Sequence, residues 1–314
     1  MIGTQSTALD WLLGSDEPGI VFQTKRDLLG EAEPAEAARV LEGPWVRALL
    51  AGQQKTGGFG VGVYGKWGGA HWRLVSLVEL GVPAGEPRCV AAAQTVLSWL
   101  TGKRHLAAVA TVDGLVRRCA SQEGNALAVC CRLGLANDPR VRLLAELLVE
   151  WQWPDGGWNC HRRASGRRSS FHESLAPMWG LHEYWAATGE DAAKQAAART
   201  AELFLEHRLF RALATGAPIH KSWLVLHYPP YWHYDVLQAL LILSRMGRAA
   251  DPRAADAVEL VESRRLADGR WRAGGRWWKP PGAEGGSVEV VDWGRSGPNE
   301  VVTLNALRIL DAAK

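Results

Sequence analysis

Apolar residues recur at helical spacing in a series of segments separated by turns rich in glycine and proline. In residues 141–151, Val141, Leu148 and Trp151 fall on one face, as in an amphipathic helix. Residues 237–243 are instead apolar on most sides, which is typical of a helix surrounded by other helices. The two patterns alternate along the chain and predict helical hairpins, each with an outer and an inner helix.

About six hairpins account for the whole chain, so we predict an all-α protein with one domain over residues 1–314. The predicted outer helices are 7–13, 36–50, 87–100, 141–151, 191–213 and 252–265. The predicted inner helices are 21–29, 70–80, 124–133, 170–185, 232–246 and 298–312. Such hairpins close into an (α/α)6 toroid or stack into an open solenoid, and we favour the closed form. A short β-pattern occurs only at 287–291.

The clearest turn between two helices is the segment 152–158, which reads Gln-Trp-Pro-Asp-Gly-Gly-Trp. Gly156 and Gly157 permit a tight reversal of the backbone, and Asp155 is suited to accept hydrogen bonds from N–H groups of the turn. Gln-Gln-Lys-Thr-Gly-Gly-Phe at 53–59 repeats the signal. We interpret this motif as scaffold rather than chemistry.

The same residues carry a family resemblance. Gln152-x-x-Asp155-Gly156-Gly157-Trp158 resembles the QW repeat of squalene–hopene and oxidosqualene cyclases. The wider pattern is similar to the prenyltransferase/squalene-oxidase repeat, which the β subunits of protein prenyltransferases share. The resemblance implies an α/α toroid whose inner helices surround a central cavity, but it does not by itself imply cyclase activity.

The chemistry of that family is only partly matched. Cyclases of this kind protonate their substrate with a DxDD motif, and here the nearest analogue, Trp232-His233-Tyr234-Asp235, keeps only the last aspartate. No aspartate-rich motif for a diphosphate occurs. Prenyltransferase β subunits bind zinc through Asp, Cys and His; Cys160, His172 and His233 have suitable chemistry, but their spacing matches no ligand signature. The sequence identifies no cofactor and leaves a metal site open.

Tryptophan is the unusual feature of the composition, with 16 residues, many of them next to Gly, Pro or His in predicted loops. A cavity lined by aromatic rings explains this loop set better than a core does. The substrate we expect is therefore a small, hydrophobic molecule. Six of the 9 histidines also lie near the predicted mouth of the inner helices, which favours a functional site there.

Charge and cysteine content exclude several classes of protein. The net charge of +3 is small and its Lys and Arg are scattered, so no nucleic-acid partner is expected. The 5 cysteines include no CxxC pair, which favours reduced thiols. No apolar run approaches the roughly 20 residues of a membrane span, and no signal peptide is visible. We expect a cytoplasmic protein without a transmembrane segment; peripheral contact with a membrane is left open.

The predicted functional centre is a quartet at the start of two consecutive inner helices, with a cysteine on the adjoining loop. Its members are His172 and Glu173, His233 and Asp235, and Cys160. Neighbouring helices lie roughly 8–10 Å apart, so we expect these side chains to converge. Asp235 or Glu173 would be the acid of a cyclisation or isomerisation if burial raised its pKa; otherwise Asp235 would stay ionised and orient His233.

Further polar and aromatic residues near the same mouth are predicted to bind the substrate. They are His71, Trp72, Cys119, Asn125, Trp223, Tyr231, Tyr234, Trp293, Asn299 and Glu300. Three functions fit this set. The first is an enzyme acting on an isoprenoid-like molecule, the second a binding protein for a hydrophobic or glycosidic ligand, and the third a hydrolase or transferase using paired carboxylates or a Cys/His centre.

Overall fold

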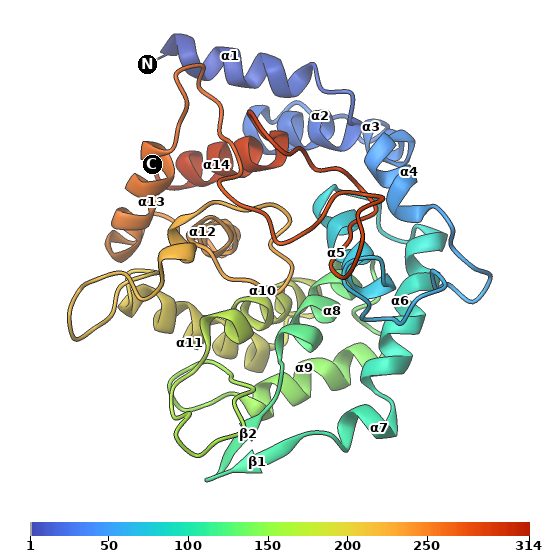
Figure 1. Ribbon diagram of the computed structural model, residues 1–314, viewed down its shortest axis with the longest axis vertical. Helices are drawn as coiled ribbons and strands as arrows, with labels where there is room; N and C mark the ends of the chain where they lie inside the picture. Colours follow the sequence, from blue (N-terminus) through green and yellow to red (C-terminus); the bar gives the residue numbers. More distant parts are fainter. Residues whose placement is uncertain (1) are drawn as a thin grey trace.

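The computed structural model describes residues 2–314, and over this range the protein is all-α apart from one small hairpin (Figure 1). Strands β1 (Ala110–Val112) and β2 (Leu115–Arg117) pair antiparallel around a turn at Asp113 and Gly114. This hairpin was not expected from the sequence. The β-pattern at 287–291 forms only an isolated bridge between Val288 and Lys279.

Six helices pack one against the next near the centre of the molecule (Figure 1). They are α2 (Pro18–Thr24), α5 (Ala70–Glu79), α8 (Ser121–Arg132), α10 (Phe171–Thr188), α12 (Val236–Arg245) and α14 (Glu300–Ala312). Contacts link α5 to α8, α8 to α10, α10 to α12, α12 to α14 and α14 to α2. Gly19 of α2 also lies against the backbone of Leu80, directly after α5. We call these the central helices.

The remaining long helices lie at the periphery, each next to a central helix (Figure 1). They are α1 (Ile2–Leu13), α4 (Pro44–Leu50), α6 (Pro87–Leu100), α9 (Pro139–Trp151), α11 (Asp191–Glu206) and α13 (Ala255–Ser263). Shorter pieces are α3 (Glu36–Arg39), α7 (Lys103–Leu106), a π-helical turn (Lys25–Leu29) and 3₁₀ turns (Val40–Glu42, Lys221–Leu224 and Pro252–Ala254). Central and peripheral helices therefore alternate along the chain, as the apolar pattern predicts.

Several predicted helices have different limits in the structure. The first outer helix begins at Ile2 instead of residue 7, and α2 covers Pro18–Thr24 instead of 21–29. The helix expected at 36–50 is broken, because Pro44 disfavours a helical conformation at Gly43 and begins α4 instead. The one expected at 191–213 ends at Glu206. The one expected at 232–246 begins only at Val236, because Asp235 has an extended backbone and caps the helix. Residues 226–235 are thus a loop, and this loop shapes the site.

The Gln–Asp–Gly–Gly–Trp turn is a structural device. Gln152 Nε2 donates to the carbonyl oxygens of Gly156 and of Ala196 in α11, both at 2.9 Å. Gly156 has a φ of 92°, and a Cβ there would lie 2.6 Å from the carbonyl oxygen of Arg199. Trp158 donates from its indole to Leu148 at 3.0 Å. The turn therefore fastens α9 to α11, in agreement with the scaffold interpretation.

Candidate functional site

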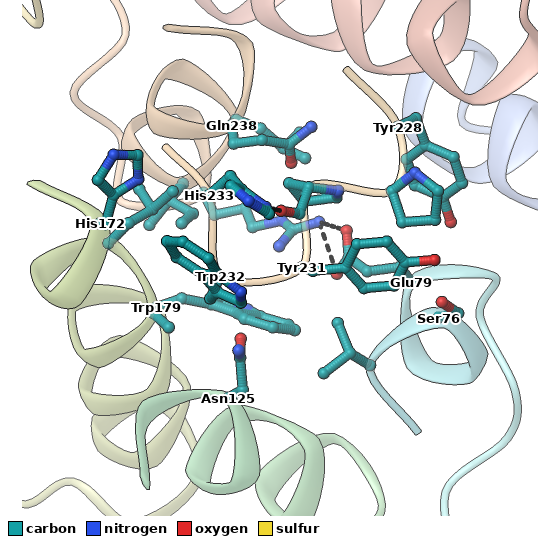
Figure 2. A pocket seen from close by; sticks show the side chains of 18 residues that line it. Ser76, Glu79, Asn125, His172, Trp179, Tyr228, Tyr231, Trp232, His233 and Gln238 are labelled. Carbon is teal, nitrogen blue, oxygen red and sulfur yellow. Dashed lines mark hydrogen bonds and ion pairs between the residues drawn. The ribbon is translucent and has the colours of Figure 1, made fainter. Parts of the chain in front are cut away.

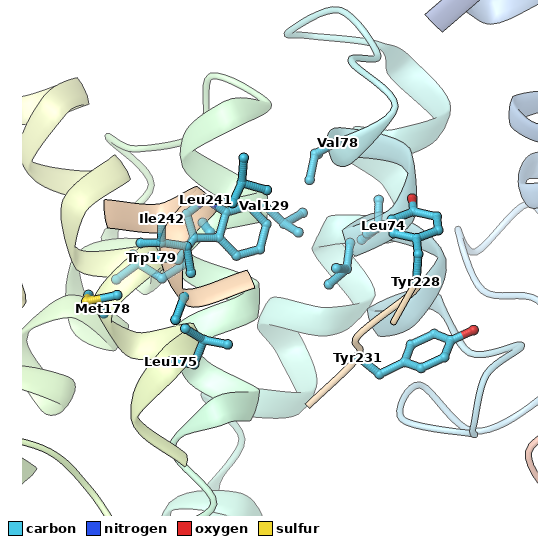
Figure 3. Packing of buried hydrophobic residues seen from close by; sticks show 14 of the residues in the cluster. Leu74, Val78, Val129, Leu175, Met178, Trp179, Tyr228, Tyr231, Leu241 and Ile242 are labelled. Carbon is cyan, nitrogen blue, oxygen red and sulfur yellow. The ribbon is translucent and has the colours of Figure 1, made fainter. Parts of the chain in front are cut away.

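A narrow cavity lies between α5, α8, α10 and α12, and the loop 228–233 closes one end of it (Figure 2). Its walls are mainly apolar side chains that the central helices turn toward one another, among them Leu175, Trp179 and Leu241 (Figure 3). The cavity offers about 40 Å³ to the centres of water molecules. A buried water needs about 10–15 Å³ by this measure, so the cavity holds about three waters as it stands.

Stacked aromatic rings hold the closing loop in place. Tyr231 lies flat on Trp67, with ring centroids 3.6 Å apart, and its hydroxyl donates to Glu289. His233 is stacked between Trp232 at 3.9 Å and Trp277 at 4.1 Å. Aromatic pairs contribute about 0.5–1.5 kcal/mol each beyond the area they bury. We call residues 228–233 the aromatic loop; its rings occupy the end of the cavity near the first turns of α5, α10 and α12.

Two polar groups on the cavity wall lack partners. Asn125 is 3% exposed, and its Nδ2 has no hydrogen-bond partner among the described residues. The hydroxyl of Tyr228, also buried, is likewise unpaired within residues 2–314. An unsatisfied buried donor costs about 1–3 kcal/mol, so native proteins rarely keep one without water or a ligand to satisfy it. Asn125 faces the space below Trp179 and Trp232 (Figure 2).

His172 and His233 both line the cavity, with ring centroids 6.3 Å apart. Burial lowers the pKa of each to about 4, so both rings are neutral at pH 7. Nδ1 of His172 accepts from the N–H of Tyr234 at 2.8 Å, which leaves the proton on Nε2. Nδ1 of His233 lies 3.2 Å from the carbonyl oxygen of Pro230, which assigns the proton to Nδ1 and leaves Nε2 as an acceptor. The pair therefore offers one donor and one acceptor.

Charged residues close the other end of the cavity. Glu79 (Figure 2) accepts from Arg245 at 3.0 Å. It also accepts from Arg132, which lies outside the cavity wall, at 3.3 Å. Burial alone would raise the pKa of Glu79, but the guanidinium groups of Arg245 and Arg132 together lower it below its usual range. Glu79 is thus ionised and paired, and it is not available as a proton donor.

Asp235 does not face His233. Its Oδ1 accepts from the N–H of Gln238 at 3.0 Å, which caps α12, and its Oδ2 accepts from the N–H of His227 at 3.1 Å. The same oxygen lies 3.1 Å from Nδ1 of His227. Asp235 is 1% exposed and does not line the cavity described above. The sequence predicted that Asp235 orients His233, and this prediction is wrong. The histidine that Asp235 orients is His227.

Glu173 lies with two cysteines instead of with His233. Ligand atoms of Cys119, Cys160 and Glu173 all lie within 4.8 Å of one another. Glu173 is buried, and its Oε2 accepts from the N–H of Ser121 at 3.1 Å. Burial raises the pKa of Glu173. The predicted quartet is thus divided among three places: His172 and His233 at the cavity, Glu173 with the two thiols, and Asp235 beside His227.

The residues predicted to bind substrate are divided in a similar way. Asn125 and Tyr231 line the cavity, and Trp223 packs on Phe171 beside a separate surface groove. The others serve mainly as packing or capping residues: His71, Trp72, Tyr234 and Trp293 are buried among aromatic rings, Asn299 caps α14, Glu300 begins α14, and Cys119 belongs to the thiol cluster.

Several cavity residues were not predicted, namely Trp179, Tyr228, Glu79 and Arg245. Trp179 is hidden within the apolar pattern of α10, which does not distinguish a ring facing a cavity from one facing the core. A signal did exist for the charged pair. Glu79 and Arg245 each lie in the last turn of a predicted inner helix.

No protein-family model, curated protein or solved structure matches this chain. The resemblance to the cyclase and prenyltransferase repeats thus depends on the residues already quoted. Over residues 2–314, no helix combines the length and the apolar character needed to cross a bilayer. The function is therefore inferred from the geometry of the cavity.

Proposed function

We propose that the six hairpins form a closed (α/α)6 toroid similar to that of the terpenoid cyclases. The packing of α14 on α2, and of Gly19 on the backbone of Leu80, supports closure between the first and last hairpins. Ion pairs support it too, because each central helix, or the π-helical turn that continues α2, contributes a charged residue. Arg132 pairs with Glu79 and Glu183, Arg245 pairs with Glu79, and Arg308 pairs with Asp27.

The function that this cavity supports best is the binding of a small, uncharged, largely apolar molecule of isoprenoid type. The observation that carries the proposal is the amide nitrogen of Asn125, which has no hydrogen-bond partner among residues 2–314 and lies in a mainly apolar and aromatic wall. Apolar walls with few polar groups are typical of small-molecule sites, where the polar groups fix orientation. The ligand therefore carries one hydrogen-bond acceptor, such as a carbonyl or hydroxyl oxygen.

The present volume sets a condition on binding. A cavity with space for about three waters is too small for an isoprenoid. The aromatic loop, which closes one end of the cavity, therefore moves outward when the ligand enters. The loop is held mainly by ring stacking and by two hydrogen bonds, one from Tyr231 to Glu289 and one from the indole of Trp278 to the carbonyl oxygen of Tyr228. Its displacement exposes the faces of Trp67 and Trp277, which then become part of the binding surface.

Titration with geranylacetone, an isoprenoid ketone, tests the proposal through the intrinsic fluorescence of the 16 tryptophans, of which Trp179 and Trp232 line the cavity. We expect saturable binding to the wild-type protein. Asn125→Leu should weaken it by up to about tenfold, since a lost hydrogen bond costs about 0.5–1.5 kcal/mol. A hydrocarbon with the same carbon skeleton and no oxygen should bind wild type and variant alike. Failure of the ketone to bind, or an equal loss with the hydrocarbon, would refute this assignment.

A second candidate function is proton transfer on the bound molecule, as in the isomerisation of an unsaturated ketone. The complementary tautomers of His172 and His233 favour it. His233 Nε2 would take a proton from the carbon beside the carbonyl and return it elsewhere, while His172 Nε2–H would stabilise the developing enolate oxygen. NMR of geranylacetone in heavy water tests this: protein-dependent exchange should vanish in His233→Ala. Exchange at the buffer rate with wild type would exclude the reaction.

A further inference from the structure

Two cysteines and a glutamate meet outside the central cavity. Cys119 precedes α8, Cys160 follows the turn at 152–158, and Glu173 lies in the first turn of α10. A parallel bridge between Arg117 and Asn159 aligns the two cysteine-bearing segments side by side. The hydrogen bond from the N–H of Arg118 to the carbonyl oxygen of Asn159, at 3.1 Å, fixes this alignment. Three separate segments of the chain thus deliver three potential ligands to one point.

We propose that Cys119, Cys160 and Glu173 bind a divalent zinc-class cation. Thiolates and a carboxylate are ligands that Zn²⁺ takes, and soft thiolates exclude Mg²⁺ and Ca²⁺ as the preferred ions. The three ligand atoms lie within 4.8 Å of one another. Two sulfurs on a tetrahedral zinc stand about 3.8 Å apart, given a Zn–S distance of about 2.3 Å. Small rotations of the side chains therefore suffice to complete the geometry.

The charges around the cluster fit a cation. Glu123 lies close enough to Glu173 for the two carboxyl groups to repel each other. Arg118 pairs with Glu123 at 2.5 Å, and Nε2 of His105 lies 2.9 Å from the same carboxylate. Two thiolates and two carboxylates face this arginine and one histidine, so a divalent cation brings the cluster near neutrality. The other oxygen of Glu123, Oε2, is buried without a partner in the described part of the chain.

The proposed metal site would link two loops and leave one coordination position open, and the central cavity does neither. The metal site joins the loop before α8 to the loop before α10. With three protein ligands, a tetrahedral ion keeps its fourth position for water or for a small thiol or oxyanion. Both cysteines are only partly buried, which gives an ion access. The set also differs from the one that the family resemblance implied, because His172 and His233 belong to the cavity wall.

Cobalt titration of the reduced, chelator-treated protein tests the site. We expect one equivalent of Co²⁺ with a thiolate-to-metal absorption band that Zn²⁺ then displaces. Cys119→Ser and Cys160→Ser should each weaken binding by more than the roughly 10–100-fold that loss of an outer partner costs. Glu173→Gln should weaken it while the band persists. Cys131→Ser changes a partly buried cysteine on α8 outside the cluster and should bind as wild type does.

X-ray absorption of the zinc-loaded wild type gives an answer that does not depend on the variants' folding, and it should report two sulfur neighbours. Three results would overturn the proposal. They are the absence of a thiolate band in reduced protein, a band that survives in both cluster cysteine variants, and a Cys119–Cys160 disulfide that resists the reductant and leaves no metal bound.

Discussion

Asn125 and His71 are both buried with polar atoms unpaired, but their surroundings differ. Asn125 faces the cavity, where a ligand or water can reach its amide. His71 is 1% exposed and packs against Tyr64, Trp72 and Trp99, and neither ring nitrogen has a partner within the described range. The first residue is thus suited to recognition. His71 lowers stability, and no ligand compensates for its unpaired ring nitrogens within the described range. The two residues therefore lead to separate predictions.

Asn125→Leu should leave the ligand-free protein as stable as wild type or more stable by about 1 kcal/mol. The reason is that leucine has a similar shape and removes a buried donor that lacks a partner. Urea unfolding of protein stripped of small molecules measures the change. A loss of more than about 2 kcal/mol would mean that the amide already has a structural partner, and the assignment of Asn125 to ligand binding would fall.

His71→Phe should reduce the dependence of stability on pH. Burial lowers the pKa of His71 from 6.5 to about 3. Between these pH values, His71 is protonated in the unfolded chain and neutral in the folded protein. The stability that the neutral ring supports is therefore complete above pH 6.5 and is lost as pH falls toward 3. Between pH 7.5 and 5.5, wild type should lose about 1.4 kcal/mol more than His71→Phe.

Chemical unfolding of both proteins at the two pH values gives this difference directly. Glu17 acts in the opposite direction, because burial raises its pKa from 4.5 to about 7 and its contribution is lost as pH rises through that range. It is present in both proteins and cancels in the comparison. Parallel pH profiles for wild type and variant would show that His71 is protonated in the folded state.

At the scale of the element, helix ends were predicted best where proline or glycine marks them. Pro87 begins α6 as expected, and Pro139 begins α9 two residues before the predicted start at 141. The start of α12 was placed four residues too early, because an apolar pattern continues through residues 232–235 although Asp235 caps the helix. Helical periodicity does not distinguish a buried loop of aromatic residues from a first helical turn. The aromatic loop was missed for this reason.

Gly124→Ala should separate α8 from α10. A Cβ at Gly124 would lie 2.3 Å from the backbone nitrogen of Pro177, at a crossing where Gly180 is equally tight. We expect a loss of about 3 kcal/mol in urea unfolding, although alanine by itself favours a helix over glycine. Gly62→Ala is the matched control, because a Cβ there meets nothing within 4 Å, and it should change stability by less than about 0.5 kcal/mol. Equal effects would contradict the close crossing.

At the scale of the whole molecule, a network of ion pairs around Glu79 ties α5, α8, α10 and α12 together at the end opposite the aromatic loop. Glu79→Gln should therefore cost about 2–4 kcal/mol, because it leaves Arg132 and Arg245 largely buried without a shared anion. Glu262→Gln removes a solvent-exposed partner of Arg265 and should cost less than about 1 kcal/mol. Thermal unfolding of the two variants compares them. A small effect of Glu79→Gln would mean that the network does not hold the helices together.

The sequence predicted the alternation of helices well because one-dimensional periodicity reports burial. It predicted the site poorly because a site depends on which residues meet from distant segments. His172 and His233 were correctly expected to lie near each other. Glu173 was expected beside them. It directly follows His172 in α10, but its side chain lies with Cys119 and Cys160 instead. Only the packing of α8 on α10 and the bridge at Asn159 decide this, and neither leaves a signal in local sequence.

Mass spectrometry of small molecules released by denaturing the purified protein tests most directly whether the central cavity is a binding site. Ala176→Phe places a ring in the cavity, and Ala187→Phe places the same ring on the exposed side of α10. We predict that wild type and Ala187→Phe release the same uncharged, largely apolar compound, and that Ala176→Phe, folded by circular dichroism, releases none. Equal release from all three proteins, or release of charged compounds alone, would contradict the account.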